Sequence, residues 1–190
     1  MELSIISPER IVAEYKARGW ENVICYGMGS TLDDVKNAAA AEMNIVCSAA
    51  AIKAAEYLKE KFGTPYEIEY PQSCLPEEIV QKAYNFTDKN VLVIHNQTAA
   101  DAVRKLITEK SGKCHCTSAT FFMQKKELLQ QSDFFLADES DLCDNVGDNY
   151  DVVIADKTLR RVMKNFSGEF IDFPHFGLSG RLLQGESEKI

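Results

Sequence analysis

Apolar positions recur along this chain with the spacing first of a strand and then of a helix. Residues 44–47 form a short apolar run, and the apolar positions that follow lie three or four residues apart, at Ala51, Ile52, Ala55, Leu58 and Phe62. This spacing predicts an amphipathic helix with one apolar stripe. Gly63 suits a left-handed helix end and Pro65 cannot continue a helix. The segment therefore predicts a strand, a helix and a return to the next strand.

The same alternation extends over the whole chain. Strand-like runs lie at residues 22–26, 43–47, 66–70, 91–95, 113–118, 133–137, 152–155 and 169–173. Helical patterns begin at Ser7 with Pro8 and continue at residues 32–41, 49–62, 76–86, 98–107, 123–129 and 157–163. Strands that alternate with helices indicate right-handed βαβ units and parallel sheets. We predict an α/β fold of two stacked Rossmann-like or flavodoxin-like parallel units.

A polar stretch divides the chain into two halves. Residues 70–90 contain Pro71, Pro76 and a polar helical pattern. We predict a first, partial α/β unit at residues 1–75, a bridging helix and linker at 76–90, and a second unit at 91–190.

Charge and composition exclude several classes of protein. The net charge is −8 and the pI is near 5.0, with no basic run, which argues against direct nucleic-acid binding. No apolar stretch approaches the roughly 20 residues of a membrane helix, and the N-terminus lacks the pattern of a signal peptide. The six cysteines are scattered, unlike those of a disulfide scaffold. We expect a cytoplasmic protein.

Ligands of parallel α/β sheets bind beyond the carboxyl ends of the strands. Polar or small residues follow several predicted strands of this chain. We predict a cleft between the two units that is lined by Gly29, Ser30, Cys47, Ser48, His95 and His175. No catalytic residue and no metal ligand is assigned.

Each candidate also has a structural explanation. Gly29 and Ser30 belong to a turn that could bind an anion or simply cap a helix, with Ser30 and Asp33 as a capping box. Cys47 is either a buried strand-end residue or a thiolate favoured by the following helix. His95 is either a hydrogen-bonded structural residue or a ligand or acid–base group, and His175 lies in a turn that looks packed.

Two further clusters have structural explanations as well. In Cys114-His115-Cys116 a strand would direct both thiols to one face and His115 to the other, which favours core packing over metal binding. The acidic residues between 138 and 151 favour a helix cap over a cation site.

Several segments, in order, resemble the nitrogenase component 1 family, which includes the molybdenum-iron protein subunits and their cofactor-assembly and pigment-biosynthesis relatives. These are the glycine turn Gly29-Ser30-Thr31-Leu32-Asp33, the strand–helix–Gly-x-Pro segment at 44–65, the strand and helix at 91–107, the strand Tyr150-Asp151-Val152-Val153-Ile154-Ala155, and the closing turn Asp172-Phe173-Pro174-His175-Phe176-Gly177. The resemblance covers almost the whole chain.

The resemblance implies an oxidoreductase subunit that accepts electrons from an ATP-dependent iron–sulfur reductase, or that holds a metallocofactor during assembly. It implies a homo- or hetero-oligomer with a component 1-like subunit. The family's two cofactor-ligand positions fall on Ser48 and Pro174, next to Cys47 and His175. Its cluster cysteines belong to a preceding domain, so the chain is expected to be a C-terminal two-domain portion or a truncated relative. An iron–sulfur or metal cofactor would belong to the full-length assembly.

Two other hypotheses remain at this point. The chain could be a non-catalytic module that binds a small molecule or cofactor, or acts as a scaffold. It could instead be an unrelated flavodoxin-like or periplasmic-binding-like domain, although it has neither a glycine-rich phosphate loop nor a signal peptide. We predict that the chain alone binds no iron–sulfur cluster and shows no reductase activity, because stable clusters need about four converging thiolates.

Overall fold

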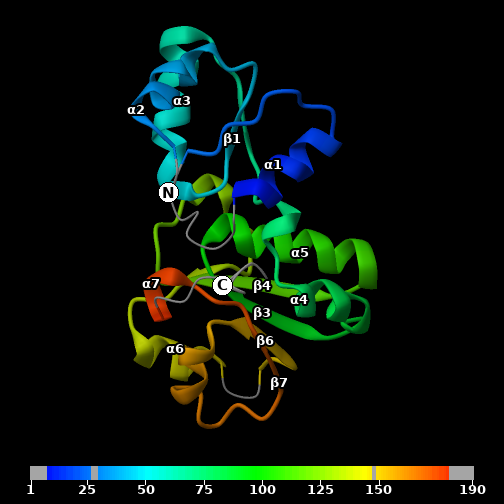
Figure 1. Ribbon diagram of the computed structural model, residues 1–190. Helices are drawn as coiled ribbons and strands as arrows, with labels where there is room; N and C mark the ends of the chain where they lie inside the picture. The colour runs from blue at the N-terminus through cyan, green and yellow to red at the C-terminus, as the bar shows by residue number, and fades with distance from the viewer. Residues whose placement is uncertain (1–7, 27–29, 147–148, 180–190) are drawn as a thin grey trace, which may run out of the picture. The chain divides into compact units, whose positions relative to one another are not determined.

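The protein was analysed as a computed structural model, which describes residues 8–26, 30–146 and 149–179. These residues fall into two compact units, the first ending at Cys74 and the second beginning at Leu75. Both are α/β units with parallel sheets, as the alternation of strands and helices predicts (Figure 1). Among the described helices, none is both long enough and apolar enough to cross a membrane.

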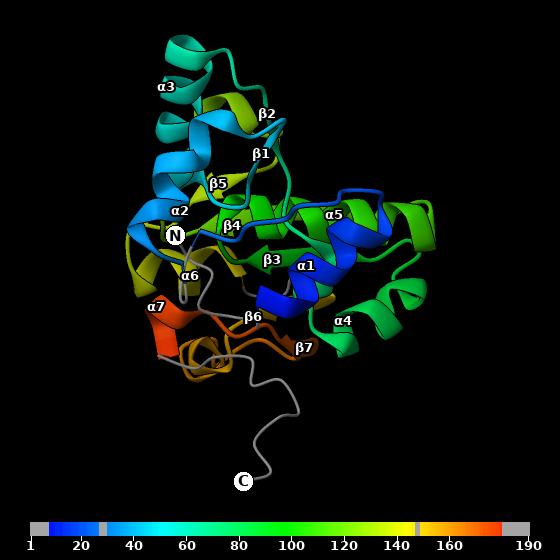
Figure 2. The same ribbon diagram turned by 45° about the horizontal axis from the view of Figure 1, so that its top comes forward.

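The first unit is built around a parallel pair of short strands, β1 (Asn44–Val46) and β2 (Tyr66–Ile68). Helix α3 (Ile52–Phe62) connects them and runs alongside them (Figure 2). Gly63 ends α3 with a φ of +75°, the left-handed conformation that glycine adopts at low cost. The strand–helix–strand prediction for residues 44–68 is therefore confirmed.

The remaining elements of the first unit are helical. They are α1 (Pro8–Ala17), α2 (Leu32–Lys36) and the 3-10 turns η1 (Asn37–Ala40), η2 (Ala49–Ala51) and η3 (Gln72–Cys74). The carboxylate of Glu14 in α1 accepts hydrogen bonds from the main-chain N–H groups of Gln72 and Ser73, at 3.3 and 2.9 Å. This contact fixes α1 against the start of η3.

Two sequence predictions for the first unit are wrong in detail. Residues 22–26 form no strand, although their apolar pattern suggested one. The capping box at the start of α2 lies one residue later than expected. Thr31 accepts from the N–H of Asp34 at 3.2 Å, and the Asp34 carboxylate accepts from the N–H of Thr31 at 2.7 Å.

The second unit contains a five-stranded parallel sheet in the order β5-β4-β3-β6-β7 (Figure 1). Its strands are β3 (Asn90–Ile94), β4 (His115–Thr120), β5 (Phe134–Phe135), β6 (Val152–Ala155) and β7 (Glu169–Asp172). The chain builds outward from β3 to β5 and then returns to add β6 and β7 on the other side of β3. The strand order therefore reverses between β3 and β6, at the topological switch point where such sheets bind ligands.

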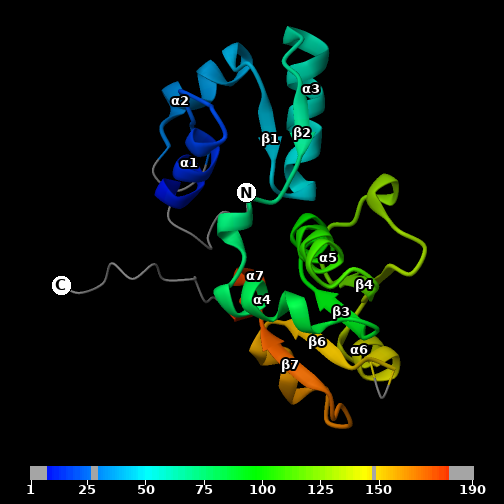
Figure 3. The same cartoon turned by 90° about the vertical axis from the view of Figure 1, so that its right-hand side faces the viewer.

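Helices cover both faces of this sheet. Figure 3 shows α5 (Gln97–Ser111) on one side of β3 and β4, and α6 (Glu139–Val146) on the other. Leu92 and Ile94 of β3 belong to a buried cluster with Leu142 and Val146 of α6. The alternate residues Val91 and Val93 therefore face the α5 side, because successive strand residues point to opposite faces. Burial on both faces explains why β3 and β6 are continuous apolar runs.

The second unit also contains shorter helical elements: α4 (Glu77–Lys82), α7 (Phe176–Ser179) and the 3-10 turns η4 (Ala83–Asn85), η5 (Lys126–Leu128) and η6 (Lys157–Arg161). The helices expected at 123–129 and 157–163 are only the turns η5 and η6. The polar segment at 76–90 packs within this unit, since the N–H of Phe86 donates to the Ser111 hydroxyl at 3.1 Å and that of Asp88 to the Lys113 carbonyl at 2.8 Å.

Candidate functional site at the carboxyl edge of the five-stranded sheet

Two polar residues follow the central strands at the switch point. His95 comes directly after β3 and Asp156 directly after β6, and the last residues of these strands, Ile94 and Ala155, are partners in the ladder. Both side chains are fully buried. Local sequence puts them there, since each directly follows an apolar strand of a sheet that helices cover on both faces.

The Asp156 carboxylate holds the turn that follows β7. Its Oδ1 accepts from the N–H and the hydroxyl of Thr158, at 2.9 and 2.8 Å. Its Oδ2 accepts from the N–H of His175 at 2.8 Å and from the hydroxyl of Ser179 at 2.6 Å. Burial by itself raises the pKa of Asp156, but the bonds from Ser179, His175 and Thr158 outweigh it and hold the pKa far below its usual range. The carboxylate is therefore ionised and satisfied by the protein itself.

Four aromatic rings pack together beside this carboxylate. The ring of His95 stacks on Phe173 with a centroid separation of 4.0 Å and meets His175 edge-on at 4.6 Å. His175 in turn stacks on Phe122 at 3.8 Å. Nε2 of His95 lies 3.2 Å from the carbonyl oxygen of Pro174, which assigns the proton to Nε2 because a carbonyl only accepts.

Burial decides the charge of His95. Loss of hydration, followed by the nearby His175, lowers the pKa of His95 to about 3. The imidazole is thus neutral near pH 7. In this conformation His95 acts as a packed, hydrogen-bonded ring.

The start of α5 is covered by the chain as well. Asn96 caps the helix, and its Oδ1 accepts from the N–H of Ala99 at 2.9 Å. The amide of Gln97 makes two bonds to the main chain of Lys125, donating from Nε2 at 3.0 Å and accepting at Oε1 at 2.9 Å. The loop after β4 is thereby fastened over the first turn of α5. The carboxyl edge is held closed by the loop after β4 on one side and the turn after β7 on the other.

The structure brings together two of the six predicted site residues. His95 and His175 are in contact at the carboxyl edge of the second unit. Ser30 precedes the α2 cap, and Gly29 lies outside the described residues. Cys47 and Ser48 follow β1 in the first unit, where the Ser48 hydroxyl accepts from the N–H of Ala50 at 3.3 Å and caps η2. A common cleft for all six residues stays a prediction.

Burial disfavours the thiolate form of three cysteines, among them Cys47 of the predicted site and Cys116 of the Cys-His-Cys segment. Burial raises the pKa of Cys47 to about 12, and it raises the pKa of Cys74 and Cys116 to about 12 as well. These thiols are protonated near pH 7 and are therefore weak nucleophiles, because the thiolate is the form that attacks. Among the described residues, no three His, Cys, Asp or Glu side chains are grouped to hold a metal ion.

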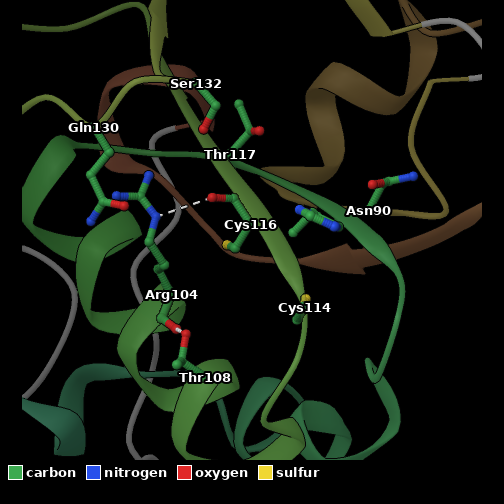
Figure 4. Close-up of a pocket in the computed structure, with 9 residues that line it drawn as sticks. Asn90, Arg104, Thr108, Cys114, Cys116, Thr117, Gln130 and Ser132 are labelled. Carbon is green, nitrogen blue, oxygen red and sulfur yellow. Dashed lines mark hydrogen bonds between the residues drawn. The ribbon is translucent and has the colours of Figure 1, made fainter.

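Sequence reasoning missed a buried ion pair elsewhere in the second unit. Arg104 of α5 contacts Asp101 and Asp133, and its side chain is only 8% exposed. These residues lie near a pocket of about 460 Å³ that is lined by the first part of β4 (Figure 4). The Asp-x-x-Arg spacing of Asp101 and Arg104 on a predicted helix could have indicated the contact between these two residues. Only the fold brings Asp133 to Arg104.

Comparison with known proteins leaves the family open. No family model matches the chain, and no curated protein matches it. A solved structure described as "Nitrogenase Cp1 at pH 6.5" is similar to it, with a TM-score of 0.49 and 15% sequence identity. The similarity covers 80% of this chain and 43% of that chain. The chain therefore spans less than half the length of the nitrogenase protein that it resembles.

Proposed function

We propose that this chain is a binding or scaffold module of a nitrogenase component 1-like oxidoreductase and is not a catalytic centre by itself. The sequence resemblance supports the first part of the proposal, because the motifs follow one another in the family's order over almost the whole chain. The closed carboxyl edge of the five-stranded sheet supports the second part.

One observation carries the proposal. At the switch point, where a parallel α/β sheet offers room to a ligand, Asp156 binds the main chain of His175 and the hydroxyl of Ser179. The position is thus occupied by the protein's own turn. A carboxylate with four internal donors is suited to holding structure, since its lone pairs are already used.

A reductive role is the second candidate, and one contact favours it. His175 lies next to the position where the resemblance implies a cofactor-ligating histidine, and it is held against His95 at the carboxyl edge. In that role the turn after β7 would have to open before either ring could meet a cofactor, because His95 is 0% and His175 only 2% exposed.

Reconstitution separates the two candidates. The purified chain would be incubated anaerobically with iron and sulfide, and bound iron and visible absorbance would be measured after desalting. It would then be mixed with an ATP-dependent iron–sulfur reductase, and electron uptake would be followed. For a scaffold we expect no stoichiometric cluster and no electron uptake, but saturable binding to a component 1-type subunit in a pull-down with both proteins purified.

A stoichiometric cluster with reductase-dependent electron uptake would overturn the scaffold proposal in favour of the reductive role. Absence of binding to component 1-type subunits, with the chain folded by circular dichroism, would overturn both. A His175→Gln variant serves as the control, because glutamine keeps a polar side chain but removes the imidazole that the reductive role requires.

A further inference from the structure

Among the described residues, the first part of β4 has a strand neighbour on one side only. Its residues pair with β3 from His115 onward, whereas β5 pairs only with Ala119 and Thr120. Backbone groups of successive residues point to opposite sides of a strand. The N–H of His115 donates to Lys89 and the carbonyl of Ala119 accepts from His95, so these alternate residues face β3. The backbone groups of Cys116 and Ser118 consequently face the side on which β5 lies, and β5 begins only opposite Ala119.

Two side chains take the hydrogen-bonding places of the missing strand. Arg104 donates from Nε to the Cys116 carbonyl at 3.2 Å. Asp133 accepts at Oδ1 from the Ser118 N–H at 2.9 Å. One residue therefore supplies a donor and the other an acceptor, as the backbone of an adjacent strand would.

The pair is built into the protein. The Arg104 guanidinium donates to the Asp133 carboxylate and, at 2.9 Å, to Asp101. The second oxygen of Asp133 accepts from the N–H of Gln130 at 3.0 Å. The Arg104 and Asp133 side chains are 8% and 1% exposed. Such burial holds both groups in one geometry, unlike a surface ion pair of long, mobile side chains.

The pocket beside the pair is the space that a longer neighbouring strand would fill. Cys114, Cys116 and Thr117 of the β4 segment line it, together with Gln130 and Ser132 from the segment that leads into β5. Figure 4 shows Arg104 rising from its helix to the Cys116 carbonyl at the border of this space. A strand that entered here would have to displace the Arg104 side chain from that carbonyl.

We propose that the Arg104–Asp133 pair is an edge cap, which prevents the unpaired edge of β4 from pairing with a strand of a second copy of this chain. Unpaired strand edges are templates for association, and proteins protect them with charged side chains or with covering elements. The cap uses charged side chains. Its removal leaves the Cys116 carbonyl and the Ser118 N–H open to a backbone partner, and the pocket provides the room.

Sedimentation of matched variants tests the cap. Arg104→Met removes the donors while keeping a long side chain. The double variant Arg104→Met with Asp133→Leu removes the cap without leaving a buried, unpaired carboxylate, a replacement that other buried ion pairs tolerate. Arg160→Met is the control, because Arg160 also donates to main-chain carbonyls, in its case those of Met163 and Phe166, but not at a strand edge.

We expect the double variant to keep the circular dichroism of the natural protein and to associate more strongly, with a weight-average mass that rises with concentration. The control should sediment like the natural protein. Hydrogen exchange should show new protection at Cys116 in the associated form. A folded double variant that sediments like the natural protein at every concentration would refute the cap, as would equal association of the Arg160→Met control.

Discussion

Replacing Asp156 by asparagine changes one acceptor oxygen into an N–H₂ group at the centre of the closed carboxyl edge. The asparagine oxygen can keep the two bonds from Thr158, which fold back from the same 3-10 turn. The new amide then faces the main-chain N–H of His175, and two donors cannot bond. The Ser179 hydroxyl can rotate and accept from the amide, but the His175 N–H cannot adapt.

The expected loss follows from these contacts. A buried donor left without an acceptor costs about 1–3 kcal/mol, and bonds to a charged group are about twice as strong as neutral ones. Together they predict a decrease of about 2–4 kcal/mol in the free energy of unfolding. For a unit of about 100 residues this corresponds to a fall of about 8–16 °C in Tm.

Thermal unfolding followed by circular dichroism measures this effect. Asp151→Asn is the matched control, because the exposed Asp151 carboxylate accepts from the N–H of Asn90 at 2.8 Å and an asparagine oxygen can replace it. We expect the control to lose less than about 1 kcal/mol. If the two variants unfold within about 1 °C of each other, Asp156 does not hold the edge as described.

Three further outcomes follow from individual groups. Because the folded-state pKa of Asp156 is lowered, its ionised form stabilises the fold fully above about pH 5, and this contribution is lost as the pH falls below about 4. The free energy of unfolding should therefore decrease less steeply with falling pH in Asp156→Asn than in the natural protein. Parallel curves for the two proteins would contradict this. Gly63→Ala should lower the free energy of unfolding, measured in urea, by about 1–2 kcal/mol. The cost comes from the backbone, because φ is +75° whereas the added methyl group meets no atom within 4 Å. An unchanged midpoint of urea unfolding would argue against a left-handed helix end. Cys143, which is exposed, should react first with a disulfide reagent under native conditions. The buried Cys74, with a pKa of about 12, should react only as the protein opens. Rapid labelling of both thiols would show that the burial of Cys74 is not maintained.

Strand and helix types were predictable because they depend on local periodicity. The apolar run at 91–95 and the stripe from Ala51 to Phe62 are properties of neighbouring residues, and the structure places β3 and α3 there. The errors occur where the local signal is weak. Residues 22–26 have strand-like composition, but no strand in the described part of the chain pairs with them. The predicted helices at 123–129 and 157–163 are short 3-10 turns.

The candidate site was predictable only in part. The sequence analysis named His95 and His175 by the rule that ligands bind beyond the carboxyl ends of the strands. Folding brings the centroids of these two rings to 4.6 Å from each other. The same rule would also select Asp156, which directly follows the predicted strand at 152–155, but the sequence analysis did not name it. The importance of Asp156 comes from bonds to residues 19 and 23 positions away, which the sequence does not show. The sequence also could not give the charge state of His95. Its pKa depends on burial, and burial results from the elements packed around the strand and not from the strand alone.

The sequence by itself determined the parallel α/β class of this protein and the identity of its central strands, because period and apolar content are local properties that backbone geometry translates directly into elements. Only the tertiary structure decided the order of the strands in the sheet and the contacts between distant segments. It reversed the strand order between β3 and β6, closed the carboxyl edge with Asp156, and set Arg104 and Asp133 against the open edge of β4. Each of these features joins residues far apart in the chain, and such contacts form only when burial compensates for the loss of chain entropy on folding.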